Sequence, residues 1–128
     1  MNFIGLRVSE ETELLLEIRK NINSPVSSNG DYWCYVDITI RNHNFEIRDA
    51  GELITYYELT DVNNSLKDII NNKVVETTEV EIIEPDLDFI VNKSSLDLRL
   101  NINDWEFYNV RIQGDNLAKL SKFIDELK

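Results

Sequence analysis

The residues best suited to chemistry in this 128-residue chain are carboxylates, concentrated around the stretch E-I-I-E-P-D-L-D-F at positions 81–89. With two preceding glutamates they form an acidic segment that contains no lysine or arginine: Glu76, Glu79, Glu81, Glu84, Asp86 and Asp88. Paired carboxylates can act as a catalytic acid and base, but only if their surroundings push their pKa values apart. They can also hold half of a metal site, dock a basic partner, or form the solvated side of a strand.

The alternation of residues within this segment favours a solvated or partner-facing surface over catalysis. Asp86 and Asp88 alternate with Leu87 and Phe89, so on a strand the carboxylates and the apolar side chains point to opposite faces. Residues 79–82 alternate in the same way. We therefore expect the six carboxylates to lie on a face that is open to solvent or to a basic partner.

Other residue combinations give no stronger candidate for a reactive site. Cys34 falls on the apolar side of a predicted strand and His43 in a predicted turn, so a nucleophile–base pair is not expected. D-V-N-N-S at 61–65 resembles the start of a calcium loop, but Leu66 and Asn72 replace the required glycine and glutamate. The sequence contains no C-x-x-C, H-E-x-x-H, G-x-S-x-G or glycine-rich phosphate loop. We predict a protein that is not an enzyme and has no metal site and no cofactor.

Composition narrows the range of partners. The chain has 13 basic and 24 acidic residues, giving a formal net charge of -11 at pH 7. Nucleic acids and anionic membrane surfaces both require a basic face, so we expect neither as a partner. The sequence has a single cysteine, no apolar run of about 20 residues and no signal-peptide pattern, which together predict a cytoplasmic protein.

The elements that position the carboxylates follow from apolar periodicity. Strand-like patterns occur at 3–8, 13–20, 32–41, 45–50, 74–84, 87–92, 94–102 and 105–113. Helical spacing predicts one inserted helix at about 60–72, with Thr60 or Asp61 as its N-cap, and a C-terminal helix at about 115–128. We expect a single α+β domain over residues 1–128: a mostly antiparallel meander of about seven to eight strands with these two helices.

Aromatic residues offer a second kind of surface. A sugar-binding or protein-binding face could be built from Trp33, Tyr35, Tyr56 or Tyr57, Trp105 and Phe107. We expect most of them instead to lie in the core or in cross-strand pairs.

The order of these features resembles the WapI-type immunity proteins of Gram-positive bacteria. W-C-Y-V-D-I-T-I is followed by N-F-E-I, a helical L-x-x-I-I, the stretch E-I-I-E-P-D-L-D-F, a leucine-alternating strand, W-x-F, and a terminal G-D-x-L-x-x-L. The resemblance covers roughly residues 32–128 and is firmest at E-P-D-L-x-F and G-D-x-L-x-x-L. Neither motif is specific alone.

This resemblance implies a small cytosolic binding protein that neutralises the C-terminal domain of a polymorphic toxin encoded beside it, commonly a nuclease. The partner would then be a basic protein domain, and the carboxylates of the acidic segment would be candidates for contacting it. Two alternatives remain open from the residues. The chain could be a structural or regulatory module that self-associates through a strand edge, or, less favoured, a small hydrolase that uses the carboxylates of 81–88.

Overall fold

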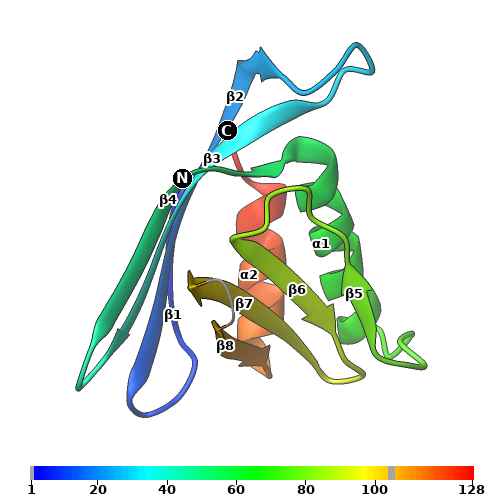
Figure 1. Cartoon of the computed structure of the whole chain (residues 1–128). Helices are drawn as coiled ribbons and strands as arrows, with labels where there is room; N and C mark the ends of the chain where they lie inside the picture. Colours follow the sequence, from blue (N-terminus) through cyan, green and yellow to red (C-terminus); the bar gives the residue numbers. More distant parts are fainter. Residues whose placement is uncertain (1, 104–105) are drawn as a thin grey trace.

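The chain folds into two four-stranded antiparallel sheets and two helices over the part that the structure, a computed structural model, describes: residues 2–103 and 106–128 (Figure 1). Sheet A contains, in spatial order, β1 (Phe3–Arg7), β2 (Thr12–Pro25), β3 (Tyr32–Asn42) and β4 (Glu46–Thr55). Sheet B contains β5 (Thr78–Val80), β6 (Leu87–Val91), β7 (Ser95–Asn103) and β8 (Glu106–Gln113). Helix α1 (Tyr56–Ile70) connects the sheets and α2 (Asp115–Asp125) follows β8. The predicted α+β class, the antiparallel pairing and the number of strands are confirmed.

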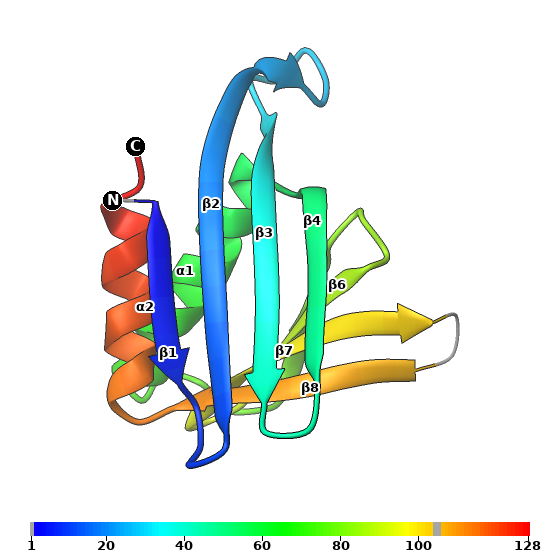
Figure 2. The ribbon, with the colours of Figure 1, turned by 90° about the vertical axis from the view of Figure 1, so that its left-hand side faces the viewer.

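One face of sheet A packs against the rest of the molecule, and its other face is open. On β3 the buried side chains are those of Cys34, Val36, Ile38 and Ile40, as period-2 alternation predicts. In Figures 1 and 2, sheet B and both helices lie on this buried side, and the long β7–β8 hairpin crosses the strands of sheet A steeply. No described element covers the opposite face of sheet A. The core is therefore formed between two sheets and two helices, and both sheets keep an outer face in solvent.

Helix α1 begins earlier than the sequence pattern indicated. The predicted start at 60 with Thr60 or Asp61 as N-cap was wrong, because Thr55 is the N-cap and the first turn starts at Tyr56. The Thr55 hydroxyl accepts a hydrogen bond from the Glu58 backbone N–H at 3.2 Å, and the Glu58 carboxylate accepts one from the Thr55 N–H at 2.9 Å. This reciprocal capping box defines the boundary. The helix ends at Ile70, two residues before the predicted end.

The predicted strand over 74–84 is also largely wrong. Only Thr78–Val80 pairs with β6, and residues 81–86 form an irregular loop before β6 begins at Leu87. Pro85 has no N–H to donate to a ladder, which is consistent with the chain leaving the sheet there. The single meander that we expected is therefore two meanders, separated by α1 and the segment that follows it.

The remaining elements agree with expectation apart from their ends. Helix α2 ends at Asp125 rather than near 128, and it starts after Gly114, whose φ of 59° lies in the left-handed region that glycine tolerates best. Trp105, one of the aromatic residues considered for a binding face, lies outside the described residues. Neither of the described helices is long and apolar enough to cross a membrane.

The corrected helix start leads to a stability prediction. Replacing Thr55 by Val keeps the shape of this fully buried side chain but removes the hydroxyl that caps α1, so we expect a loss of about 1–2 kcal/mol in the free energy of unfolding. Asp61→Ala, at the position that the sequence pattern suggested as a cap, is expected to change stability by less than about 0.5 kcal/mol. Urea denaturation of both variants measures the difference, and equal losses would contradict Thr55 as the cap.

Candidate functional site

Four of the six predicted carboxylates surround one open hollow on the surface of sheet B. Its volume is about 400 Å³, and its acidic lining comes from Glu79, Glu81, Glu84 and Asp88. The apolar part of the lining comes from Ile82, Pro85, Leu87 and Phe107. We call this the acidic hollow. Its side chains come from β5, the 81–86 loop, β6 and β8, so folding brings together residues that the sequence places in one acidic segment with an aromatic from much later in the chain.

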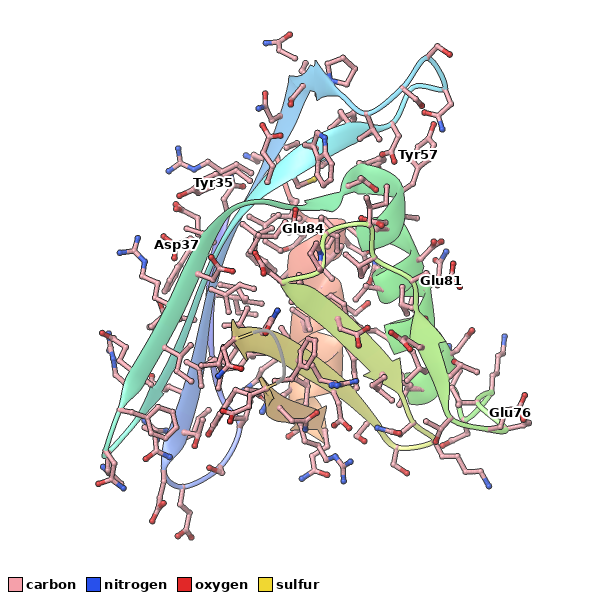
Figure 3. The ribbon with its side chains drawn as sticks, viewed as in Figure 1. Tyr35, Asp37, Tyr57, Glu76, Glu81 and Glu84 are labelled. Atoms are coloured by element: carbon pink, nitrogen blue, oxygen red, sulfur yellow. The ribbon has the colours of Figure 1, made fainter. Side chains whose placement is uncertain are left out.

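The other two predicted residues lie elsewhere. Glu76 precedes β5 and does not line the hollow, and Figure 3 shows it well away from Glu81 and Glu84. Asp86 stands close enough to Asp49 of β4 that its charge raises the pKa of Asp49. The prediction that these six carboxylates form one partner-binding surface is not tested by the geometry, which groups four of them and separates two.

One basic residue does reach the hollow, although the acidic segment itself has none. The Arg99 guanidinium extends from β7, with its Nη1 3.2 Å from the Asp88 Oδ2 and its central carbon 4.5 Å from the centre of the Phe107 ring. Arg99 lies opposite Asp88 in the β6–β7 register. It therefore neutralises one carboxylate of the hollow and packs against its aromatic wall, and Glu81 and Glu84 have no such ion pair within the described structure.

The Asp88 carboxyl acts on the Glu79 carboxyl from the neighbouring strand. A hydrogen bond between the two carboxyls raises the pKa of Glu79 above its ordinary value, and repulsion from the Asp88 charge adds to the effect. The two residues face the same side of neighbouring strands, β5 and β6. Two carboxylates this close favour one proton between them, so Glu79 is expected to take up a proton before an isolated glutamate does as the pH falls.

The shape of the loop beside the hollow depends on a buried glutamate from α1. Glu58 is 8% exposed, and its second carboxylate oxygen accepts a hydrogen bond from the Ile83 backbone N–H at 2.7 Å. Its first oxygen is the one that completes the capping box with Thr55. A single carboxylate therefore joins the start of α1 to the 81–86 loop, which carries Glu84 and Pro85.

Sequence reasoning missed both Glu58 and Arg99 as contributors to this surface. The T-Y-Y-E sequence at 55–58 is a capping-box pattern, so the local role of Glu58 had a visible signal. Nothing in the sequence indicated its contact with Ile83, which is 25 residues away. The alternation of leucines at 96–100 places Arg99 on the outer side of its strand, but its pairing with Asp88 depends on the strand register.

The other groups that could have formed a reactive or metal-binding site do not lie together in the described structure. Cys34 is fully buried at one end of β3, where burial raises the pKa of its thiol to about 11, and His43 is exposed in the turn after the other end. Asp61, Asn63 and Ser65 belong to α1 and form no calcium loop. Within residues 2–103 and 106–128, no cluster of three or more His, Cys, Asp or Glu residues is arranged to hold a metal ion.

The interaction between the Glu79 and Asp88 carboxyls leads to a titration prediction. Because the hydrogen bond to Asp88 is the main cause of the raised pKa of Glu79, Asp88→Asn should move the titration of the Glu79 carboxyl to lower pH. Arg99 remains in that variant and also lowers the pKa of Glu79. NMR titration of the side-chain carboxyl carbons measures the shift, with Glu81 in the same spectra as the control. An unchanged midpoint for Glu79 would show that the two carboxyls do not interact.

Comparisons with known proteins give one match. The family model described as the immunity protein WapI-like family matches residues 6–128, which adds the end of β1 and all of β2 to the region that the sequence resemblance covered. Neither the search of curated proteins nor the search of solved structures gave a match. Because the model covers nearly the whole chain, with every described strand of sheet B and both helices inside it, this chain belongs to the immunity protein WapI-like family.

Proposed function

We propose that this protein binds the C-terminal domain of a toxin encoded beside it and neutralises that domain by covering a basic surface, without catalysing a reaction. The observation that carries the proposal is family membership over residues 6–128, together with the acidic hollow. A nuclease must present a basic surface to its substrate, so a nuclease domain is the toxin class that this charge suits best. The protein acts in the cytoplasm, where such a toxin finds its substrate.

Charge contributes in two ways that differ in range. The net charge of -11 attracts a basic domain over long distances and raises the rate of encounter. At short range, Glu81 and Glu84 present carboxylates that have no ion pair within the described residues, next to the apolar surface of Pro85 and Phe107. A lysine or arginine side chain can place its methylene groups on that apolar surface and its charge on the carboxylates.

The acidic hollow also has the features of an anchor point. Phe107 is 38% exposed at its wall, and aromatic residues are enriched at protein–protein interfaces. Glu58 holds the adjacent loop by a buried hydrogen bond, so less loop entropy is lost on binding. These two observations support the hollow as the centre of the contact surface.

The proposal as a whole is tested by co-expression. We expect the toxin domain encoded next to this gene to be lethal when expressed alone and harmless when expressed with this protein, and the two chains to purify as one complex. If the neighbouring toxin domain neither binds this protein nor loses its toxicity, the proposed function is wrong. Assaying the purified toxin domain for nuclease activity, with and without this protein, tests the finer assignment separately.

The contribution of the acidic surface is tested by removing its charge. In one variant Glu79, Glu81, Glu84, Asp86 and Asp88 become the corresponding amides, and we expect toxin binding to weaken by at least about tenfold, roughly 1.4 kcal/mol, with a smaller dependence on salt. Isothermal titration calorimetry at two salt concentrations measures both effects.

A matched variant separates local from overall charge. It removes the same number of carboxylates from exposed positions away from the hollow: Glu10, Glu11, Asp61, Asp68 and Glu126. Both variants have the same net charge, so slower association is expected in both. A loss of affinity much larger in the first variant locates the interface at the hollow and the adjoining Asp86, and equal losses would show that only the overall charge matters. Thermal denaturation checks that both variants are folded.

A further inference from the structure

Strand β4 forms an open edge of sheet A. The Asn42 N–H donates to the Phe45 carbonyl at 2.9 Å, which fixes this pair as a hydrogen-bonded one in the β3–β4 hairpin. Hydrogen-bonded and non-bonded pairs alternate along an antiparallel ladder. In the observed register, Ile47 and Asp49 therefore exchange bonds with β3, whereas the N–H and C=O groups of Glu46, Arg48 and Ala50 point away from it.

These outward-pointing backbone groups have almost no hydrogen-bond partners among the described residues. Within the described residues the backbone of Glu46 and Arg48 has no hydrogen-bond partner on this side, and the Ala50 N–H is held only by the neighbouring Asp49 Oδ1, at 2.9 Å. The opposite edge of sheet A is different, because α2 lies along β1 and the Asn116 side chain donates to the Arg7 carbonyl at 2.9 Å. One edge of this sheet is covered and the other is available for a further strand.

The side chains along this edge are acidic on both faces. Glu46 and Glu52 lie on the outer face, where the Arg41 guanidinium of β3 already pairs with Glu46 at 3.0 Å and Glu52 accepts a hydrogen bond from the Ser24 hydroxyl. The one base of the strand, Arg48, is bound through two hydrogen bonds by Asp37. On the inner face Asp49 lies opposite Ile38 and near Asp86 of the 81–86 loop. Burial raises the pKa of Asp49, and the Asp86 charge raises it further. No ion pair compensates Asp49 in the described part of the chain.

We propose that β4 is the docking edge for an extended basic segment of the toxin domain, which adds to sheet A as a fifth strand. Lysine or arginine side chains of that segment would meet Asp49 and Asp86 on the inner face and Glu52, which has no ion pair among the described residues, on the outer face. Main-chain hydrogen bonds to β4 supply affinity, and the alternating charges select the segment. This inference rests on the proposed function, because the occupant is the toxin that the protein is proposed to neutralise.

A second copy of this chain fits the edge less well. An inward-pointing charge on an edge strand, as at Asp49, is a device that discourages pairing between identical sheets. Two β4 strands would bring together three carboxylates and one already paired arginine from each copy, on molecules that each carry a net charge of -11. A basic segment would instead be attracted to these carboxylates. Asp49 can then release the Ala50 N–H to the incoming strand and turn its carboxylate to the partner's cation.

The experiment uses two substitutions at Ala50 and the toxin domain encoded beside this gene. Proline removes the outward N–H without breaking a bond to β3, and edge strands accept proline at such positions. Valine keeps the N–H on the same exposed site. We expect Ala50→Pro to weaken toxin binding by about tenfold while Ala50→Val binds like the unchanged protein. Amide hydrogen exchange of the unchanged protein gives an independent measurement, in which the Glu46, Arg48 and Ala50 amides become protected when the toxin domain binds.

The outcomes are distinct. If the toxin domain binds but these amides stay unprotected, or the two Ala50 variants bind alike with both folded, the docking edge is wrong and the proposed function stands. If Ala50→Pro does not fold, amide exchange on the unchanged protein decides alone. If the amides become protected at high protein concentration without toxin, the occupant is a second copy and this inference is overturned. If the toxin domain does not bind at all, the proposed function and the docking edge both fail.

Discussion

The buried carboxylate of Glu58 is the contact on which the arrangement of the functional surface depends. One oxygen completes the capping box that starts α1, and the other holds the Ile83 N–H at 2.7 Å. A buried carboxylate costs free energy unless its oxygens are hydrogen-bonded, so it stays in place only while both donors do. The start of α1 at the end of sheet A and the loop before β6 are thus fixed to each other. This contact lies below the surface and holds the 81–86 loop, whose residues form part of the lining of the acidic hollow.

The charged residues of the two sheets divide into those that are paired within the protein and those that are available. On the outer faces of the sheets, Arg48 donates two hydrogen bonds to Asp37, and Arg111 donates two to Asp97. Each arginine lowers the pKa of the carboxylate that it binds. Paired in this way, these carboxylates would have to give up their own cation to bind a partner. Glu81 and Glu84 at the acidic hollow and Asp49 on β4 have no such pair among the described residues, and the charge of Asp86, from the loop beside the hollow, acts on Asp49.

Much of the fold could be predicted because the alternation of apolar and polar residues along a strand indicates which side chains are buried. The β3 pattern fixed which side chains enter the core, and the leucines of 96–100 did the same for β7. Predictions failed where long-range contacts override local pattern. The residues before Glu58 look like a strand by their tyrosines, yet the capping box makes them helical, and the apolar pair Ile82–Ile83 looks like a strand interior, yet a hydrogen bond from α1 draws it out of the sheet. The division into two sheets was likewise invisible, since no local signal separates one meander from two.

Long-range contacts also limited what the sequence could indicate about the acidic hollow. Glu79, Glu81, Glu84 and Asp88 line one hollow because they are close in sequence and lie on one side of β5, the loop and β6, so the acidic segment alone indicated that they are neighbours. It could not place Arg99 or Phe107 beside them, nor Asp49 beside Asp86, since each of those contacts crosses between strands whose register the sequence does not state. Charge alone therefore indicates that a basic partner suits this protein. Only the three-dimensional arrangement separates the hollow, which suits side chains, from the edge of β4, which suits a strand, and the two together support the proposed partner, a basic domain with an extended segment.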